Sequence, residues 1–256
     1  MSWNVNGIRA AERKGFLQWL QKAKPDILGV QETKAQVEQL GDEILRPKGY
    51  ETFWSSANRK GYSGTAVYVK KSPLMSITNF HEDWLDEEGR VIMIEYPDFL
   101  FFNVYFPNGQ RGDERLQYKL DFYDKFIEYI QAYRKKGKNI IVVGDYNTAH
   151  YAIDLSRPKE NVNTSGFMPI ERAQLDRLQK LGYVDTFRQL HPEQIGAYSY
   201  WNQMTRARER NAGWRIDYVW LNKELLHQVK SAFILPDVIG SDHCPVGITL
   251  ESTLDR

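Results

Sequence analysis

The sequence predicts an α/β fold in which two packed β-sheets carry helices on their outer faces. Short runs of β-branched and aromatic residues alternate with segments whose apolar residues recur every three or four positions. Strand-like runs occur near both ends of the 256-residue chain, and each needs a pairing partner to be ordered. No Gly/Ser linker, low-complexity tract or clear internal repeat divides the sequence. These observations predict a single domain spanning residues 1–256.

The expected elements follow from residue patterns along the chain. Strands are expected at Trp3–Asn6, Asp26–Lys34, Glu51–Ser55, Ser63–Lys70, Val91–Tyr96, Leu100–Tyr105, Asn139–Val143, Trp214–Leu221 and Val246–Glu251. Helices are expected at Arg13–Lys22, Asp113–Lys135 and Ile170–Leu181, with a short element at Val184–Arg188. Asp113 is expected to cap the second helix. The polar stretch Thr148–Pro169 is long for a connection in a compact domain, so we expect a lid or a binding loop there.

Composition limits the setting and the partners. The chain has 34 Lys and Arg against 33 Asp and Glu, so its net charge of +1 gives no argument for nucleic acid. Local positive charge lies at Arg206–Arg210 and around Arg157, Lys159 and Arg172, although either cluster alone is more simply solvated loop charge. The single cysteine, Cys244, excludes an intrachain disulfide, and no apolar run can span a membrane. No signal peptide is seen at its start, so the chain is expected to be intracellular, in the cytoplasm or nucleoid. It is also expected to be a monomer.

The segment Gly144–Asn147 directly follows the buried strand Asn139–Val143. If the backbone stays extended, Asp145 and Asn147 project to the same side and can hold one water molecule between them. The alternative is an Asx turn in which the two side chains merely cap the loop. This stretch alone favours the turn.

Other predicted strands also end in polar side chains. They supply Asn4, Asn6, Glu32, Tyr105, Asp217, Asp242 and His243. Neighbours in an extended backbone point apart, so Asp242 cannot orient His243, and Asp217 is the best-placed carboxylate to do so. Taken singly, Glu32 is equally a solvated charge at a strand end, and His243 a turn residue beside Pro245. The repetition of such groups is what predicts a catalytic site.

The predicted site combines oxygen ligands with one imidazole, and no cysteine or histidine cluster has the spacing of a zinc site. Hard ligands such as Glu32 and Asp242 suit Mg²⁺, with Mn²⁺ as a substitute, and such ions bridge carboxylates and substrate phosphates.

The same residues predict phosphodiester hydrolysis. Asp145 and Asn147 would position and deprotonate a water molecule. Asn4, Tyr105, His243 and the metal would stabilise charge on a phosphorane-like transition state.

Seven stretches carry a family resemblance. They are Ser2–Arg9, Gln31–Lys34, Gly61–Gly64, Tyr105–Asn108, Gly144–Ala149, Gly213–Asp217 and Gly240–Pro245. In this order, over nearly the whole chain, they resemble the exonuclease III family of apurinic/apyrimidinic (AP) endonucleases, within the endonuclease/exonuclease/phosphatase superfamily. The resemblance implies a four-layer α/β sandwich and Mg²⁺-dependent incision of duplex DNA 5′ to an abasic site, leaving a 3′-hydroxyl. It leaves open accompanying 3′→5′ exonuclease, 3′-phosphodiesterase or damaged- and uracil-nucleotide incision activities.

The resemblance also implies residue roles. Glu32 falls at the metal ligand with Asp242 and Asn6 near it, Asp145 at the base with Asn147 as partner, Tyr105 and Asn4 at phosphate-orienting positions, and Asp217 with His243 at a carboxylate–imidazole pair. Tyr200, Trp214 and Ile216 match an apolar pocket for a flipped-out abasic sugar, and Arg111 and Met204 match side chains that insert into the duplex. The remaining expected DNA contacts are Arg206, Arg208, Lys34, Asn108 and Asn161.

Two departures from the family pattern affect these roles. Asn6 is an amide where some relatives carry an acid, which weakens a two-metal mechanism. Few residues precede the first strand, so Asn4 is expected to be less firmly held.

Two other functions remain open at this point. A phosphatase or lipid phosphodiesterase would share the catalytic set but would not need Arg111, Met204 and Trp214. A DNA-binding module that has lost catalysis would not need Glu32, Asp145 and His243.

Overall fold

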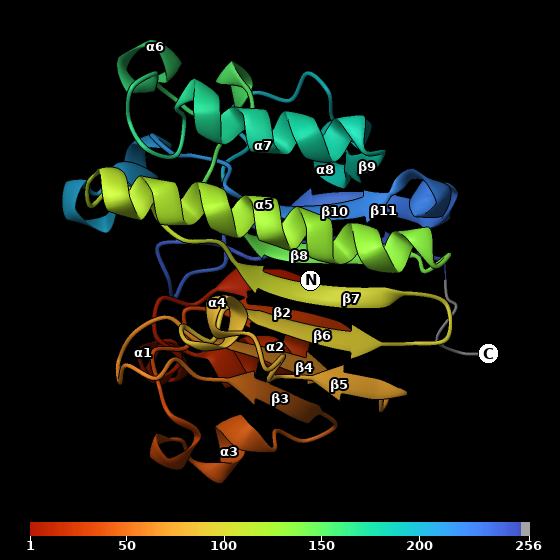
Figure 1. Cartoon of the computed structure of the whole chain (residues 1–256). Coiled ribbons are helices and arrows are strands. Elements are labelled where there is room, and N and C mark those ends of the chain that lie inside the picture. Colours follow the sequence, from red (N-terminus) through yellow and green to blue (C-terminus); the bar gives the residue numbers. More distant parts are fainter. Residues whose placement is uncertain (252–256) are drawn as a thin grey trace.

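The computed structural model describes residues 1–251 and contains two six-stranded mixed sheets packed face to face (Figure 1). The first sheet has the strand order β11 (Val229–Ile234), β12 (Val246–Leu250), β1 (Ser2–Asn4), β2 (Ile27–Gln31), β4 (Thr65–Val69) and β3 (Glu51–Ser55). The second has the order β5 (Met75–Ile77), β6 (Val91–Glu95), β7 (Leu100–Tyr105), β8 (Ile140–Asp145), β10 (Asp217–Asn222) and β9 (Tyr183–Asp185).

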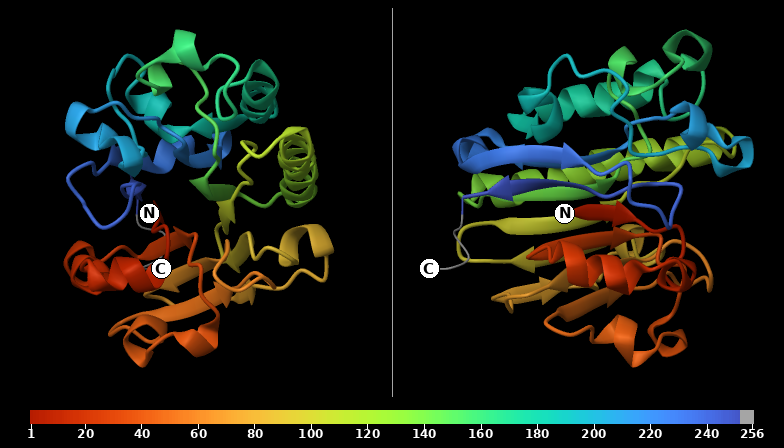
Figure 2. Two further views of the ribbon diagram at one scale, coloured as in Figure 1. Left: turned by 90° about the vertical axis from the view of Figure 1, so that its left-hand side faces the viewer. Right: turned by 180° about the vertical axis from the view of Figure 1, so that it is seen from behind.

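Helices cover the outer faces of both sheets (Figure 2). The α-helices are α1 (Ile8–Arg13), α2 (Phe16–Ala23), α3 (Asp42–Leu45), α4 (Asp83–Asp86), α5 (Asp113–Lys135), α6 (Pro158–Asn161), α7 (Pro169–Lys180) and α8 (Thr186–Leu190). The 3₁₀ helices are η1 (Val37–Gln39), η2 (Ala152–Asp154), η3 (Gln203–Thr205), η4 (Ala207–Arg210) and η5 (Lys223–Gln228). This is the predicted α/β sandwich, and the fold class is confirmed.

Three apolar cores hold the four layers together. Residues such as Val67, Ile92 and Val143 fill the space between the two sheets. Helices α5 and α7 pack on the second sheet, and α1 and α2 on the first. Trp220 and Trp3 lie within these outer cores as expected, 0% and 1% exposed. Because each sheet is covered on both faces, its strands read as nearly continuous apolar runs.

Strand register brings the polar strand ends together. In the second sheet Asp145 pairs with Tyr105 on one side and with Asp217 on the other. In the first sheet Asn4 pairs with Gln31, the residue before Glu32. The polar residues therefore gather at one end of the sandwich.

Most predicted elements are present, but several boundaries were wrong. The range of α5 is as predicted, although Gly112 rather than Asp113 is its N-cap. A helix, α1, precedes the expected first one, and the strand predicted from Trp214 begins at Asp217. The predicted loop Thr148–Pro169 contains η2 and α6. Strands β5 and β11 were not predicted, and both lie at sheet edges, where half-exposed residues give weak alternation.

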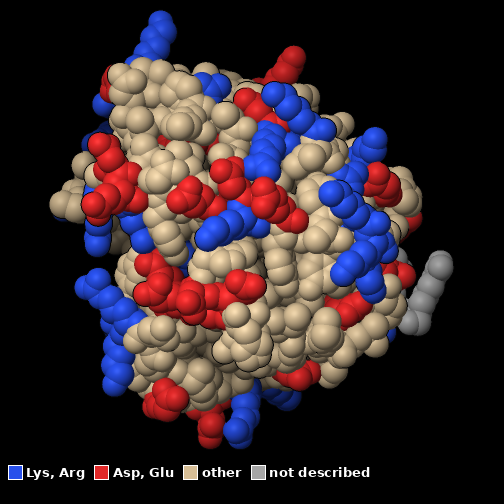
Figure 3. Space-filling view, viewed as in Figure 1, with Lys and Arg blue, Asp and Glu red and all other residues tan. Residues whose placement is uncertain are grey.

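The face crossed by α5 carries lysine and arginine interspersed with aspartate and glutamate (Figure 3). No single-sign field covers this face, in keeping with the net charge of +1. Among residues 1–251, no helix combines the length and apolarity that crossing a membrane requires.

Gly144 permits the close approach of β8 to β7 just before Asp145. Its φ is +151°, and a Cβ atom there would lie 1.8 Å from the carbonyl oxygen of Val104. We predict that Gly144→Ala lowers the free energy of unfolding by about 3 kcal/mol, the upper end of usual overpacking costs. Urea unfolding measures this loss.

Gly41→Ala is the matched control, because a Cβ atom at Gly41 meets nothing within 4 Å. We expect it to change stability by less than about 1 kcal/mol. Equal stability of the Gly144→Ala variant and the wild type would contradict the proposed close approach.

Candidate active site

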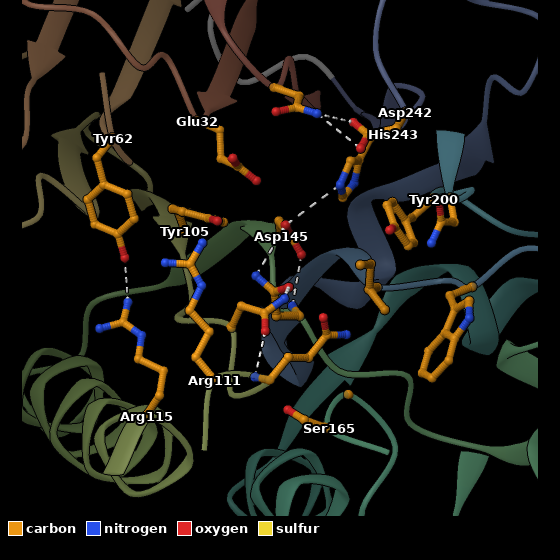
Figure 4. A pocket seen from close by; sticks show the side chains of 18 of the residues that line it. Glu32, Tyr62, Tyr105, Arg111, Arg115, Asp145, Ser165, Tyr200, Asp242 and His243 are labelled. Carbon is orange, nitrogen blue, oxygen red and sulfur yellow. Dashed lines mark hydrogen bonds and ion pairs between the residues drawn. The ribbon is translucent and has the colours of Figure 1, made fainter. Parts of the chain in front are cut away.

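A cavity of about 790 Å³ lies at the end of the sandwich where the polar strand ends meet. Of the residues singled out from the sequence, those lining it are Asn6, Glu32, Lys34, Tyr105, Asn108, Arg111, Asp145, Asn147, Asn161, Tyr200, Trp214, Ile216, Asp242 and His243. Glu32, Tyr105, Asp145 and His243 point toward one another inside it (Figure 4). Both sheets therefore contribute to one cavity.

The side chain of Asn4 connects the residues that the two sheets contribute to this cavity. Its side-chain Nδ2 donates to Oε1 of Glu32 at 2.9 Å and to Oδ2 of Asp145 at 2.8 Å. Its Oδ1 accepts from the backbone N–H of Asn6 at 2.9 Å. The residue is 0% exposed. The expectation that Asn4 is loosely held is wrong, because β1 lies between β2 and β12 and all its side-chain groups are bonded.

The segment after β8 is the Asx turn that this stretch alone favoured, and not the extended backbone that was its alternative. Asn147 has a φ of +50°, and its N–H donates to Oδ1 of Asp145 at 2.8 Å, which forms the Asx turn. The turn brings Nδ2 of Asn147 within 3.4 Å of Oδ2 of Asp145, and the same amide donates to the carbonyl of Phe106 at 2.9 Å. The turn thus places the carboxylate and carboxamide side by side.

Asp145 is buried beside a histidine. Burial, followed by the nearby Asp217 carboxylate, raises the pKa of Asp145 above its ordinary value, and His243 opposes that rise. The Nε2 atom of His243 lies 3.9 Å from Oδ2 of Asp145. Asp145 therefore has an affinity for a proton greater than that of an exposed aspartate, as a general base requires.

Asp217 and His243 form the predicted carboxylate–imidazole pair. Nδ1 of His243 lies 2.8 Å from Oδ2 of Asp217. Burial alone would lower the pKa of His243, but the Asp217 carboxylate and its hydrogen bond raise that pKa to about 10. The imidazole is then a cation and hydrogen-bond donor at neutral pH.

Ser199 fixes the carboxylate of this pair and was missed from the sequence. Its hydroxyl donates to Oδ2 of Asp217 at 2.6 Å and accepts from the N–H groups of Ile216 and Asp217, each at 3.1 Å. No local pattern marks it, since Ser199 and Asp217 are 18 residues apart.

The predicted metal ligands divide into two groups. Both oxygens of Asp242 accept from Nδ2 of Asn6 at 3.0 Å, so these two side chains satisfy each other. Among the carboxylate, histidine and cysteine side chains of residues 1–251, Glu32, Asp145 and His243 bring ligand atoms within 4.8 Å of one another.

Glu32 is the carboxylate best suited to a cation. Burial would raise the pKa of Glu32, but the Lys34 ammonium and the Asn4 amide lower it. Lys34 lies 2.7 Å from Oε2 of Glu32 and also donates to Asn6. This donor set fits a hard divalent cation through its carboxylates, whereas a protonated His243 is a poor ligand.

A buried arginine supports Tyr105 in the wall of the cavity. Arg90 is 1% exposed, donates to the carbonyl of Tyr105 at 2.8 Å and lies 4.6 Å from the centre of its ring. Burial and the Glu32 carboxylate raise the pKa of the Tyr105 hydroxyl, so it stays protonated. Beyond them, Arg115 donates to Glu88 and to the hydroxyl of Tyr62 (Figure 4). These supporting residues were not predicted.

The expected sugar pocket is an apolar recess on the remaining side of the cavity. Tyr200, Trp214 and Ile216 belong to one apolar cluster. The backbone of Tyr200 forms isolated β-bridges with Trp214 and with His243. The centre of its ring lies 4.8 Å from that of the histidine ring. A Cβ atom at Gly166 would lie 3.3 Å from the Trp214 ring, so this backbone closes the recess.

The expected DNA-contacting residues have different environments. Arg111 is exposed at the cavity rim, Met204 in η3 is 94% exposed and Arg206 is exposed beside it. Two amides already have partners, since Asn108 donates to Oδ1 of Asn147 and Asn161 to the carbonyl of Arg157. The guanidinium of Arg208 donates to backbone carbonyls of its own chain.

A buried ion pair supports the turn that contains Asp145 and Asn147. Lys119 of α5 and Glu171 of α7 are both 0% exposed, and their charged atoms are 2.6 Å apart. Lys119 also donates to the carbonyl of Asn147 at 2.7 Å. Glu171 accepts from the backbone N–H groups of Gly166 and Met168 at 2.6 and 3.0 Å. The pair thus anchors both the turn and the closing backbone of the recess.

The Endonuclease/Exonuclease/phosphatase family matches this chain over residues 1–243. The chain therefore belongs to this family, and the resemblance found in its motifs is confirmed.

Particular relatives narrow the class. The chain is 44% identical over 251 residues to an exodeoxyribonuclease of Bacillus subtilis, covering 98% of each. It is 40% identical over 251 residues to the DNA repair nuclease APEX1 of Danio rerio, covering 97% of this chain and 81% of the relative. A solved AP endonuclease from Archaeoglobus fulgidus superposes with a TM-score of 0.88 at 26% identity, covering 98% of each chain.

Lys119→Met leaves the buried Glu171 carboxylate without its cation. We predict a loss of about 3–5 kcal/mol in the free energy of unfolding, as for other broken buried pairs. Chemical denaturation at neutral pH measures the loss. Adding Glu171→Gln should recover part of it, because the uncompensated charge disappears.

Lys138→Met is the control, since Lys138 pairs with Glu95 at the surface and is 46% exposed. Its loss should stay below about 1 kcal/mol. Equal losses for the two lysine variants would show that the buried pair has no special role.

Proposed function

We propose that the protein is a DNA-repair nuclease that hydrolyses the phosphodiester 5′ to abasic sites in duplex DNA and leaves a 3′-hydroxyl. The observation that carries this proposal is the joining, in one cavity, of a phosphodiester-cleaving set around Asp145 and an apolar recess at Trp214. The exodeoxyribonuclease, DNA repair nuclease and AP endonuclease relatives support it.

The attacking water would be held by Asp145 and Asn147. The carboxylate of Asp145 takes the proton as the oxygen attacks phosphorus. Asn4 keeps that carboxylate aimed into the cavity by its 2.8 Å hydrogen bond. Burial and Asp217 make Asp145 a stronger base than an exposed aspartate. The hydrolytic step thus depends on a proton acceptor that the fold has already oriented.

Charge that develops on the phosphate would be met by donors on both sides. His243 is held as a cation by Asp217, and Tyr105 remains a neutral phenol. Glu32 would hold Mg²⁺, or Mn²⁺ in its place, whose charge stabilises the phosphate and leaving oxygens. Preorganised donors of this kind lower the barrier because they do not need to reorient during the reaction.

Selection of abasic DNA would come from the recess and the exposed wedge. Tyr200, Trp214 and Ile216 offer apolar surface to a flipped-out sugar that carries no base. Arg111 and Met204 would fill the space left in the duplex. A phosphatase or phosphodiesterase with another substrate would have no use for a methionine that is 94% exposed two residues after Asn202, which lines the cavity. A module without catalysis would not need the site around Asp145.

Three expectations from the sequence accompany this proposal. One catalytic domain over residues 1–256 is supported by a site that needs strands from both ends of the chain. A monomeric state and an intracellular location stay predictions.

The test uses end-labelled duplexes that carry an abasic analogue, uracil or no lesion, incubated with and without Mg²⁺. We expect one incision 5′ to the abasic analogue, only with metal. Loss of single nucleotides from 3′ ends would show that the protein also has an exonuclease activity. Cleavage of undamaged duplex at the same rate would contradict abasic specificity.

Asp145→Asn removes the proposed proton acceptor. We predict that turnover falls by about two to four orders of magnitude, the range for loss of a general base. Binding to abasic duplex should stay within a few-fold of the wild type in a gel-shift measurement. Unchanged cleavage would refute the assignment of the base.

Met204→Ala shortens the proposed wedge without disturbing the core. We predict a several-fold change in binding of abasic duplex or in release of nicked product, with an unchanged single-turnover rate. Pre-steady-state kinetics separate these steps. A defect confined to the chemical step would contradict the wedge assignment.

A further inference from the structure

The guanidinium of Arg208 forms hydrogen bonds with backbone carbonyls of its own chain. Its Nη2 donates to the carbonyls of Pro236 and Val238, both at 2.8 Å, and its Nη1 donates to the carbonyl of Ser241 at 3.2 Å. The guanidinium carbon also lies 4.5 Å from the centre of the Trp201 ring. Both hydrogens of Nη2 are engaged in this way, so a phosphate could bind that nitrogen only after one of these hydrogen bonds was broken.

The carbonyls that Arg208 binds belong to one segment, residues 236–241, which leads directly into Asp242 and His243. This segment connects β11 to β12 without regular structure. Ile239 in its middle is 74% exposed, and Val238 beside it is only partly buried, against the core around Trp3. At its end, the Ser241 hydroxyl donates to the carbonyl of Asn4 at 2.8 Å. We call residues 236–243 the histidine segment. It is held near one end by the hydrogen bond from Ser241 to Asn4, and along its length by the hydrogen bonds of Arg208.

Arg208 itself belongs to the wedge loop, residues 201–211, which carries Met204 and Arg206. Two backbone hydrogen bonds join the wedge loop, or the residues just before it, to the end of the histidine segment or the residue just after it. The N–H of Trp201 donates to the carbonyl of Asp242 at 2.9 Å, and that of Cys244 to the carbonyl of Ser199 at 2.8 Å. The two segments are thus hydrogen-bonded to each other, and Arg208 lies over the buried ring of Trp201.

We propose that Arg208 is a positioning residue that ties the wedge loop to the histidine segment, and not the DNA contact that the sequence suggested. This inference rests on the proposed function. Because the same side chain spans both segments, seating of Met204 in a duplex and placement of His243 at the phosphate depend on one another. Only a planar guanidinium offers several donors in a fixed fork, so lysine cannot replace it.

Arg206 provides a matched comparison in the same loop. It lies two residues before Arg208, has the same charge and is exposed. A phosphate contact at Arg206 would act through charge alone. Arg206→Ala should therefore lower the salt slope of binding by about one and leave hydrogen–deuterium exchange of residues 236–241 at its wild-type rate.

The experiment compares Arg208→Ala, Arg208→Lys and Arg206→Ala with the wild type. It measures affinity for abasic duplex between about 50 and 200 mM salt, the single-turnover incision rate at saturating DNA, and hydrogen–deuterium exchange of residues 236–241. We expect both Arg208 variants to lose at least about tenfold in rate, equivalent to about 1.4 kcal/mol. Exchange in the histidine segment should become faster, with the wild-type salt slope retained.

Several results would overturn the proposal. A reduced salt slope with normal rate and exchange in Arg208→Ala would identify a phosphate contact. Unchanged values in all three measurements would show no role, and full rescue by lysine would show that charge alone suffices. If the alanine variant does not fold, Arg208→Lys and Arg208→Gln carry the test. Exchange of the free protein needs no substrate, so it tests Arg208 even if the wild type fails to incise abasic DNA.

Discussion

The amide of Asn4 is the interaction on which the rest of the site depends. One NH₂ group donates to Glu32 in the first sheet and to Asp145 in the second. The proposed cation ligand and the proposed base therefore stand at a fixed separation, set by the packing of two sheets rather than by a loop. That rigidity is why the fold can serve as the scaffold for a reaction that relies on positioning and charge.

Several residues at this centre have a further partner that orients them. Ser199 holds Asp217, Arg90 supports Tyr105, and Lys119 binds the carbonyl of Asn147. These partners are buried polar or charged groups, which are expensive to bury unless fully bonded. The cavity thus keeps a concentrated set of ionisable groups in place because hydrogen bonds from Ser199, Arg90 and Lys119 support it. Arg208 extends the same arrangement to the wedge loop.

Sequence patterns predicted the strand ends well and the backbone at those ends poorly. Alternation and β-branched runs located Asp145 and Glu32, because strands end where apolar runs end, whereas Asp217 was expected inside a strand that in fact begins with it. Patterns did not predict the left-handed backbone of Asn6, Glu32, Lys34 and Asn147, since such conformations are imposed by surrounding structure. Lys119 and Glu171 are 52 residues apart, and Arg208 is about thirty from its acceptors, so no local signal connects them. The charge of Arg208 suggested a DNA contact, whereas its hydrogen bonds to residues 236–241 leave no mark in the local sequence.

The most direct measurement is the position of the scissile phosphate in a crystal structure of the Asp145→Asn variant with abasic duplex and Mg²⁺. The account predicts a water molecule beside residue 145, about 3–3.5 Å from the phosphorus and in line for attack. It also predicts the cation on Glu32 and the abasic sugar against Trp214. A phosphate bound away from residue 145, or a sugar left stacked in the duplex, would contradict it.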